Sequence, residues 1–104
     1  MMTVPDSLLR TIAQVYAPRR IVLFGSHARG EAGPDSDIDL VVVLDDDAPP
    51  QALSWRQRNA ARRGYMGSVD IIPCRESVLA ERALAVGSFA DTVLREGKVV
   101  YERH

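Results

Sequence analysis

The stretch that decides the fold begins with Gly25-Ser26-His27-Ala28-Arg29-Gly30 and, after a polar loop, continues as Ser36-Asp37-Ile38-Asp39-Leu40 and three valines. Side chains two positions apart on a strand point to the same face, so Asp37 and Asp39 can direct both carboxylates at one place. Two carboxylates that close repel each other unless a cation lies between them. A hard divalent ion with oxygen ligands, above all Mg²⁺, is the expected occupant.

A second feature lies just upstream of these aspartates. The run Arg20 to Phe24 reads as a buried strand that ends at Gly25, and Ser26 to Gly30 is expected to form a short helix. Backbone N–H groups at a helix start bind phosphate oxygens, and a glycine lets a ligand approach the main chain. A metal site beside a phosphate-binding turn indicates a nucleoside triphosphate. The purely structural alternative is that Ser26 is a helix N-cap and that the two glycines are ordinary turn residues.

Together these motifs have a family resemblance. The pattern Gly25-Ser26-x-Ala28-Arg29-Gly30 followed by Ser36-Asp37-x-Asp39-Leu40 resembles the signature of the minimal nucleotidyltransferases (MNT), which are small members of the DNA polymerase beta superfamily. That family has a third carboxylate on a later strand, and Asp70 in Ser68-Val69-Asp70-Ile71-Ile72 matches it. The ending from Leu94 to Glu102 is also similar to the family's, so the resemblance spans nearly the whole chain.

The resemblance implies a fold, a site and a cofactor. The fold would be α/β (α+β), a small mixed β-sheet flanked by helices in a polymerase-beta-like nucleotidyltransferase core. Asp37, Asp39 and Asp70 would be catalytic and would bind the metal, with two Mg²⁺ ions expected. Of these, Asp37 and Asp39 would hold the ion that grips the triphosphate, while Asp70 would help to deprotonate the nucleophile. The nucleotide-binding residues would be Gly25, Ser26 and Arg29.

Length and composition limit the alternatives. A chain of 104 residues with 46% apolar residues allows a single domain, 1–104, with one core and no separate substrate-binding domain. The net charge of −1 and a pI near 6.1 do not favour a nucleic-acid partner. A lone Cys74, a start without signal-peptide features and the absence of a long apolar run predict a soluble cytoplasmic protein with no membrane partner.

Periodicity and turn residues predict the remaining elements. Helices are expected over 6–16, 51–63, 76–86 and 88–95, the second ending at Gly64 and the last capped by Gly97. Strands are expected over 20–24, 38–44, 69–72 and 98–102, the third closed by Pro73. Helices that alternate with a few short strands predict a small mixed sheet.

Two residues of the turn allow more than one interpretation. Arg29 either clamps the triphosphate or pairs with an acid such as Glu31. His27 is interpreted as a helix-surface residue rather than a catalyst.

The helix after Pro50 is basic, which fits either a nucleic-acid surface or a solvated face opposite the acidic loop 45–47. A surface for a protein partner is the preferred interpretation of this region, although its apolar members could equally belong to the core. The basic residues are Arg56, Arg58, Arg62 and Arg63, and the apolar and aromatic ones are Leu53, Trp55, Tyr65 and Met66.

The resemblance also implies a biological role. Minimal nucleotidyltransferases resemble one half of a two-gene module whose other half is a helical HEPN-type protein, often a ribonuclease toxin. The implied function is therefore an antitoxin that transfers AMP from ATP, or from another nucleoside triphosphate, to a tyrosine of that toxin in a hetero-oligomer. Two alternatives remain open at this point: a non-catalytic module that neutralises its partner by binding, and transfer to a small molecule such as an aminoglycoside.

Overall fold

The fold is organised around β2 (Ile38–Leu44), in which every residue except Asp39 is buried. In the computed structural model, which describes residues 4–33 and 36–103, β2 pairs antiparallel with β1 (Arg20–Phe24) on one side and parallel with β3 (Val69–Arg75) on the other. β4 (Lys98–Glu102) adds antiparallel to β1, which gives the strand order β3-β2-β1-β4. The predicted small mixed sheet is confirmed.

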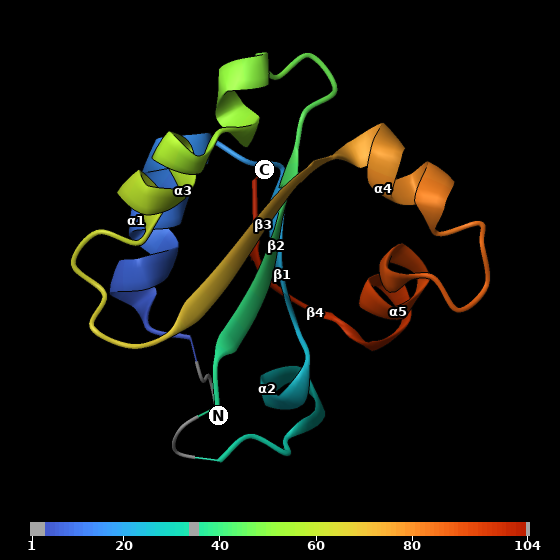
Figure 1. Ribbon diagram of the computed structural model, residues 1–104, viewed down its shortest axis with the longest axis horizontal. Helices are drawn as coiled ribbons and strands as arrows, with labels where there is room; N and C mark the ends of the chain where they lie inside the picture. Colours follow the sequence, from blue (N-terminus) through green and yellow to red (C-terminus); the bar gives the residue numbers. More distant parts are fainter. Residues whose placement is uncertain (1–3, 34–35, 104) are drawn as a thin grey trace.

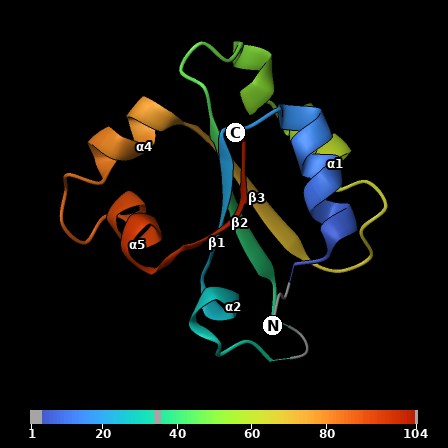
Figure 2. The ribbon, with the colours of Figure 1, turned by 180° about the vertical axis from the view of Figure 1, so that it is seen from behind.

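Helices cover both faces of this sheet (Figure 1). α1 (Asp6–Tyr16) and α3 (Trp55–Ala61) lie side by side on one face, and α4 (Glu76–Arg82) and α5 (Phe89–Glu96) lie on the other, as the reverse view in Figure 2 also shows. The short α2 (Ser26–Arg29) follows the end of β1. None of the helices in the described ranges is long and apolar enough to cross a membrane.

Alternation along the strands creates two separate cores. Leu40 and Val42 of β2 face α1 and α3, where they pack with residues such as Ile12. Val41 and Val43 face the opposite way and pack with Leu79, Val93 and other residues of α4 and α5. β2 is therefore buried on both faces, which explains its nearly continuous apolar sequence. Because Asp39 lies two positions before Val41, its side chain belongs to the α4–α5 face of the sheet.

The predicted helix over 51–63 is wrong in one respect, because the chain breaks it in two. A 3₁₀ turn (Pro50–Leu53) is followed by extended Ser54, whose hydroxyl oxygen accepts a hydrogen bond from Gln57 N at 3.3 Å and so caps α3. Serine competes for backbone donors in this way and favours the N-cap over a helix interior. α3 also ends at Ala61, and single turns carry the chain to Gly64.

The prediction that Pro73 closes the third strand is also wrong. β3 continues through Pro73 to Arg75, with Pro73 paired in register with Val42. Proline is tolerated here because β3 is an edge strand, so its missing N–H removes no bond from the interior of the ladder.

The last two helices begin close to their predicted positions, but the first of them is shorter. α4 ends at Arg82 rather than at 86, and turns connect it to Ser88, whose side chain accepts a hydrogen bond from Asp91 N at 3.1 Å to cap α5. Gly97 occupies the predicted cap of α5, but its backbone is extended rather than left-handed. A Cβ at Gly97 would collide with the Val22 side chain and the Val93 carbonyl, so close packing explains the glycine.

Candidate active site

Two of the three predicted carboxylates lie directly beside each other in the sheet. Asp39 of β2 and Asp70 of β3 are register partners in parallel strands, so their side chains project from the same face. Asp37 comes just before β2 and is exposed. It lines a cleft together with Asp70. The topology thus brings all three aspartates to one end of the sheet.

The electrostatics of Asp39 show that these acids affect one another. Partial burial of Asp39 raises the pKa of its carboxyl, and the nearby charges of Asp70 and Asp37 raise it further. His27 and Arg29 oppose this shift without reversing it. Because like charges that close destabilise the ionised form, this cluster has a negative charge that a bound cation would relieve.

The three aspartates have the chemistry of a divalent-metal site. The three aspartates supply only carboxylate oxygens, which are the ligands that Mg²⁺ prefers, and the charges of Asp70 and Asp37 add to the effect of burial in raising the pKa of Asp39. Within residues 4–33 and 36–103, no three acidic, histidine or cysteine side chains already surround one point closely enough to hold a metal ion. The donor chemistry and charge therefore fit such an ion, and the carboxylates would have to converge further to bind it.

The predicted phosphate-binding turn adjoins this acidic pair. Phe24, the last residue of β1, is the register partner of Asp39, so Gly25 follows at the level of the carboxylate. Gly25 has φ +75° and ψ −155°, and a Cβ built there would lie 2.5 Å from Asp39 Oδ2. Only glycine combines this backbone conformation with such a close approach. The main chain of the turn and the Asp39 carboxylate are therefore in direct proximity.

The interpretation of Ser26 as a helix N-cap is wrong, because Gly25 occupies the cap position and Ser26 is the first residue of α2. Ser26 contributes its backbone carbonyl, which accepts a hydrogen bond from Glu31 N at 2.9 Å. Its hydroxyl forms no hydrogen bond with the residues that the structure describes.

Of the two interpretations of Arg29, the structure shows the one in which Arg29 pairs with an acid. Arg29 Nε lies 2.6 Å from Glu31 Oε1, and Arg29 Nη1 lies 3.8 Å from Glu96 Oε1. Arg29 thereby braces α2 against the loop that follows it and against the end of α5. A contact with a triphosphate stays a prediction.

The interpretation of His27 as a helix-surface residue is correct only in part. His27 is half-buried, its Nε2 lies 3.1 Å from the Ser36 carbonyl oxygen, and its Nδ1 is buried with no hydrogen-bond partner among the described residues. It therefore connects α2 to the segment that leads into Asp37. Nothing in the single sequence distinguishes this histidine from a solvated one, because its burial depends on how that segment folds back.

A polar cleft of about 690 Å³ opens at the outer edge of β3. One wall carries Asp37 and Asp70, and the other comes from the C-terminal part of α3 and the turn after it. The cleft is lined by Asp37, Asn59, Arg62, Arg63, Tyr65, Gly67, Ser68, Val69 and Asp70.

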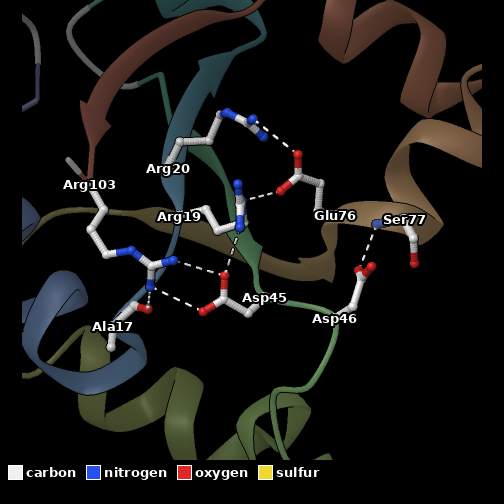
Figure 3. A network of polar contacts seen from close by, with 8 residues as sticks. All are labelled: Ala17, Arg19, Arg20, Asp45, Asp46, Glu76, Ser77 and Arg103. Atoms are coloured by element: carbon white, nitrogen blue, oxygen red, sulfur yellow. Dashed lines mark hydrogen bonds and ion pairs between the residues drawn. The ribbon is translucent and has the colours of Figure 1, made fainter.

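The arginines of the α3 region are exposed, as the solvated-face interpretation predicts, but within the described residues none of them forms an ion pair with the 45–47 loop. In Figure 3, Asp45 binds Arg103 through two hydrogen bonds of 2.9 and 3.1 Å and also binds Arg19 at 3.1 Å. Asp46 accepts a hydrogen bond from Ser77 N at 2.9 Å, at the start of α4. The acidic loop is therefore occupied by other partners, at the end of β2 away from Asp39.

The fold and the paired carboxylates define a nucleotidyltransferase-type domain, and the sequence comparison agrees. The family described as "Nucleotidyltransferase domain" matches residues 6–85, and the chain belongs to this family. The match contains the turn at Gly25 and all three aspartates.

Solved structures share the fold at low sequence identity. A toxin–antitoxin structure with AMP-PNP has a TM-score of 0.62 and 21% identity, over 97% of this chain and 76% of that one. A mutant of the toxin–antitoxin MntA–HpeT has a TM-score of 0.59 and 18% identity, over 97% of this chain and 75% of that one. A protein from Sulfolobus solfataricus described as a nucleotidyltransferase has a TM-score of 0.55 and 18% identity, over 99% of this chain and 94% of that one. No curated protein sequence matches this chain.

Proposed function

We propose that this chain is a Mg²⁺-dependent nucleotidyltransferase that transfers AMP from ATP to a hydroxyl, namely a tyrosine of a HEPN-type toxin, and so acts as an antitoxin. The observation that carries the proposal is the register pairing of Asp39 with Asp70 beside the main chain of Gly25. This arrangement supports a triphosphate whose reacting phosphorus lies between the turn and the acids. Membership in the nucleotidyltransferase domain family supports the same class of chemistry.

Each residue has a distinct task in this proposal. The backbone of Gly25 and the hydroxyl of Ser26 bind phosphate oxygens of the nucleotide, and Asp37 and Asp39 are the ligands for Mg²⁺. When bound, the ion stabilises negative charge on the phosphate oxygens. Asp70 orients the acceptor hydroxyl and takes its proton. The hydroxyl oxygen then forms a bond to the α-phosphorus, the bond from that phosphorus to the bridging oxygen breaks, and pyrophosphate leaves.

Exposed apolar side chains support a protein partner. Leu84 and Val86, between α4 and α5, are 82% and 95% exposed, and Phe89 at the start of α5 is half-exposed. Met66 and Trp55, which the sequence offered as partner-surface residues, are also exposed, whereas Tyr65 packs against the core. Large apolar side chains left in solvent are typical of surfaces that another protein covers. The toxin–antitoxin structures with the same fold support a toxin as that partner.

The direct test is label transfer in lysate from the source organism. The purified chain is incubated with Mg²⁺ and ATP labelled at the α-phosphate, with the Asp37→Asn, Asp39→Asn double variant as control. We expect label on one protein with the wild type and none with the double variant, and mapping of the label to a tyrosine of a HEPN-type protein. Label on a small metabolite would instead identify a small-molecule acceptor.

The same double variant separates chemistry from binding. If toxin neutralisation depends on AMP transfer, the double variant loses it while still folding. Neutralisation that survives the double substitution would show that the chain acts as a stoichiometric binding module and would contradict the enzymatic proposal.

A further inference from the structure

The elements of the site follow a fixed order across the sheet. Gly25 lies at the end of β1, Asp39 in β2 and Asp70 in β3, and the polar cleft opens beyond β3. Asp70 lines this cleft and Asp39 does not. If the triphosphate binds at Gly25, as the proposed function requires, the cleft is on the opposite side of the acidic pair. That is the side from which an acceptor hydroxyl can reach Asp70.

The wall of the cleft opposite the aspartates carries two uncompensated positive charges. Arg62 and Arg63 are exposed and form no ion pair with any residue that the structure describes. Arg62 makes only a long hydrogen bond of 3.5 Å to Asn59 Oδ1. At the other end of the sheet, by contrast, Arg19, Arg20 and Arg103 each contact an acid. Guanidinium groups bind carboxylates and phosphates through paired hydrogen bonds, so this wall fits an anionic ligand.

Further observations favour a protein over a nucleic acid as the source of those anionic groups. Met66, in the turn that lines the cleft, is 98% exposed, and Trp55 lies one helical turn before Asn59 on the same side of α3 and is also exposed. Methionine and tryptophan are enriched in protein interfaces.

We propose that this cleft binds the acceptor as an acidic segment of the partner protein, with carboxylates that flank the acceptor hydroxyl paired to Arg62 and Arg63 and the hydroxyl directed at Asp70. The proposal rests on the nucleotidyltransferase function. It also specifies the class of acceptor: a segment with acidic residues next to the hydroxyl binds more tightly than a neutral one.

The test measures peptide binding rather than transfer. A fluorescein-labelled peptide with a central tyrosine between two pairs of glutamates is titrated, by fluorescence anisotropy, with the chain in Mg²⁺ and AMP-PNP. A matched peptide has glutamine in place of each glutamate. We expect the wild type to bind the glutamate peptide about tenfold more tightly, and the Arg62→Ala, Arg63→Ala variant to lose that preference.

The control variant is Arg56→Ala, Arg58→Ala, which removes the same charge from α3, just before Arg62 and Arg63, at positions that do not line the cleft. We expect it to keep the preference for the glutamate peptide. An equal loss in this control, no preference in the wild type, or tighter binding of an oligouridylate of the same charge would overturn the proposal. Binding of AMP-PNP is measured in parallel: its absence would contradict the proposed function itself, whereas intact AMP-PNP binding without peptide preference would overturn only this inference.

Discussion

The two ends of the β1–β2 pair hold the same kinds of charged groups in opposite electrostatic states. At one end, hydrogen bonds from Arg103 and Arg19 hold the pKa of Asp45 below its ordinary value. At the other end, burial and the neighbouring Asp70 and Asp37 raise the pKa of Asp39. The acid at the first end is paired with arginines, whereas the acids at the second end lie near one another, an arrangement that a bound cation would stabilise. Titratable groups perturbed by like charges are typical of functional sites.

The same contrast applies to the arginines. Those at the compensated end are bound in the network of Figure 3, where Glu76 contacts both Arg19 and Arg20. Arg62 and Arg63, beside the acidic end, have no acidic partner among residues 4–33 and 36–103. The cleft thus places two exposed arginines near two aspartates, whereas the Asp45 and Glu76 network at the far end joins N-terminal, central and C-terminal parts of the chain through ion pairs.

The largest effect is expected from Asp70→Asn. If Asp70 accepts the proton of the acceptor hydroxyl, this substitution lowers the rate of AMP transfer by roughly 10²-fold or more while nucleotide binding persists. The measurement is transfer of labelled AMP, with circular dichroism and AMP-PNP binding as controls. A folded variant that transfers AMP at the wild-type rate would show that the role assigned to Asp70 is wrong.

The next largest effect is expected from Gly25→Ala, because the added Cβ would lie 2.5 Å from Asp39 Oδ2. Gly30→Ala is a matched control, since Gly30 has a similar φ of +73° but no atom within 4 Å of the added Cβ. Gly30→Ala carries the backbone strain of about 1–2 kcal/mol that a left-handed residue costs, and Gly25→Ala is expected to lose more stability because the Gly25 ψ of −155° lies in a region that essentially only glycine adopts. Only Gly25→Ala is expected to weaken AMP-PNP binding strongly, by about tenfold or more. Equal weakening of AMP-PNP binding in the two variants would show that the close approach of Gly25 to Asp39 has no special role in nucleotide binding.

A smaller effect, a gain in stability rather than a loss of function, is expected from Asp39→Asn. The pKa of Asp39 is raised in the folded state, so folding favours its protonated form. The stabilisation that protonation gives is therefore present at acid pH and is lost as the pH rises through the raised pKa. At neutral pH the neutral asparagine therefore raises the Tm by a few degrees, and this gain shrinks toward low pH. Scanning calorimetry from pH 4 to 7 measures it, and a lower Tm for the variant at neutral pH would contradict the account.

The smallest effect is expected at the compensated end, from Asp45→Asn. The lowered pKa of Asp45 means that its stabilising contribution is present at neutral pH and is lost as pH falls through that pKa. Because these ion pairs are exposed, we expect a small decrease in Tm at neutral pH, none at low pH, and no change in AMP transfer. Asp47→Asn in the same loop is the matched control. A transfer defect in Asp45→Asn alone would show that the two ends are coupled.

The sequence predicts the central strands and the first helix better than it predicts the contacts between distant segments. The strands at 20–24 and 38–44 follow directly from runs of apolar residues, and their boundaries are confirmed. The same is true of the helix at 6–16, whose apolar residues repeat on one face. These local patterns were sufficient to predict the mixed sheet, and the resemblance pointed to Asp70 as the third carboxylate.

The features that the sequence did not predict depend on tertiary contacts. Pro73 could remain in a strand because β3 is at the edge of the sheet, a property of strand order rather than of local sequence. The burial of His27 depends on how the segment before Asp37 folds back, and no periodic pattern reports it. That Arg62 and Arg63 line the same cleft as Asp70 depends on how the turn after α3 approaches β3. Such relations join residues distant in sequence, which periodicity does not describe.

The central claim is that the uncompensated end of the sheet binds a nucleotide together with Mg²⁺. The most direct test is calorimetric titration of AMP-PNP into the wild type and into the Asp37→Asn, Asp39→Asn double variant, each with Mg²⁺ and with EDTA. The account predicts binding to the wild type that depends on Mg²⁺ and is lost in the double variant. Equal binding by both proteins, or binding by the wild type that is the same in EDTA, would contradict it.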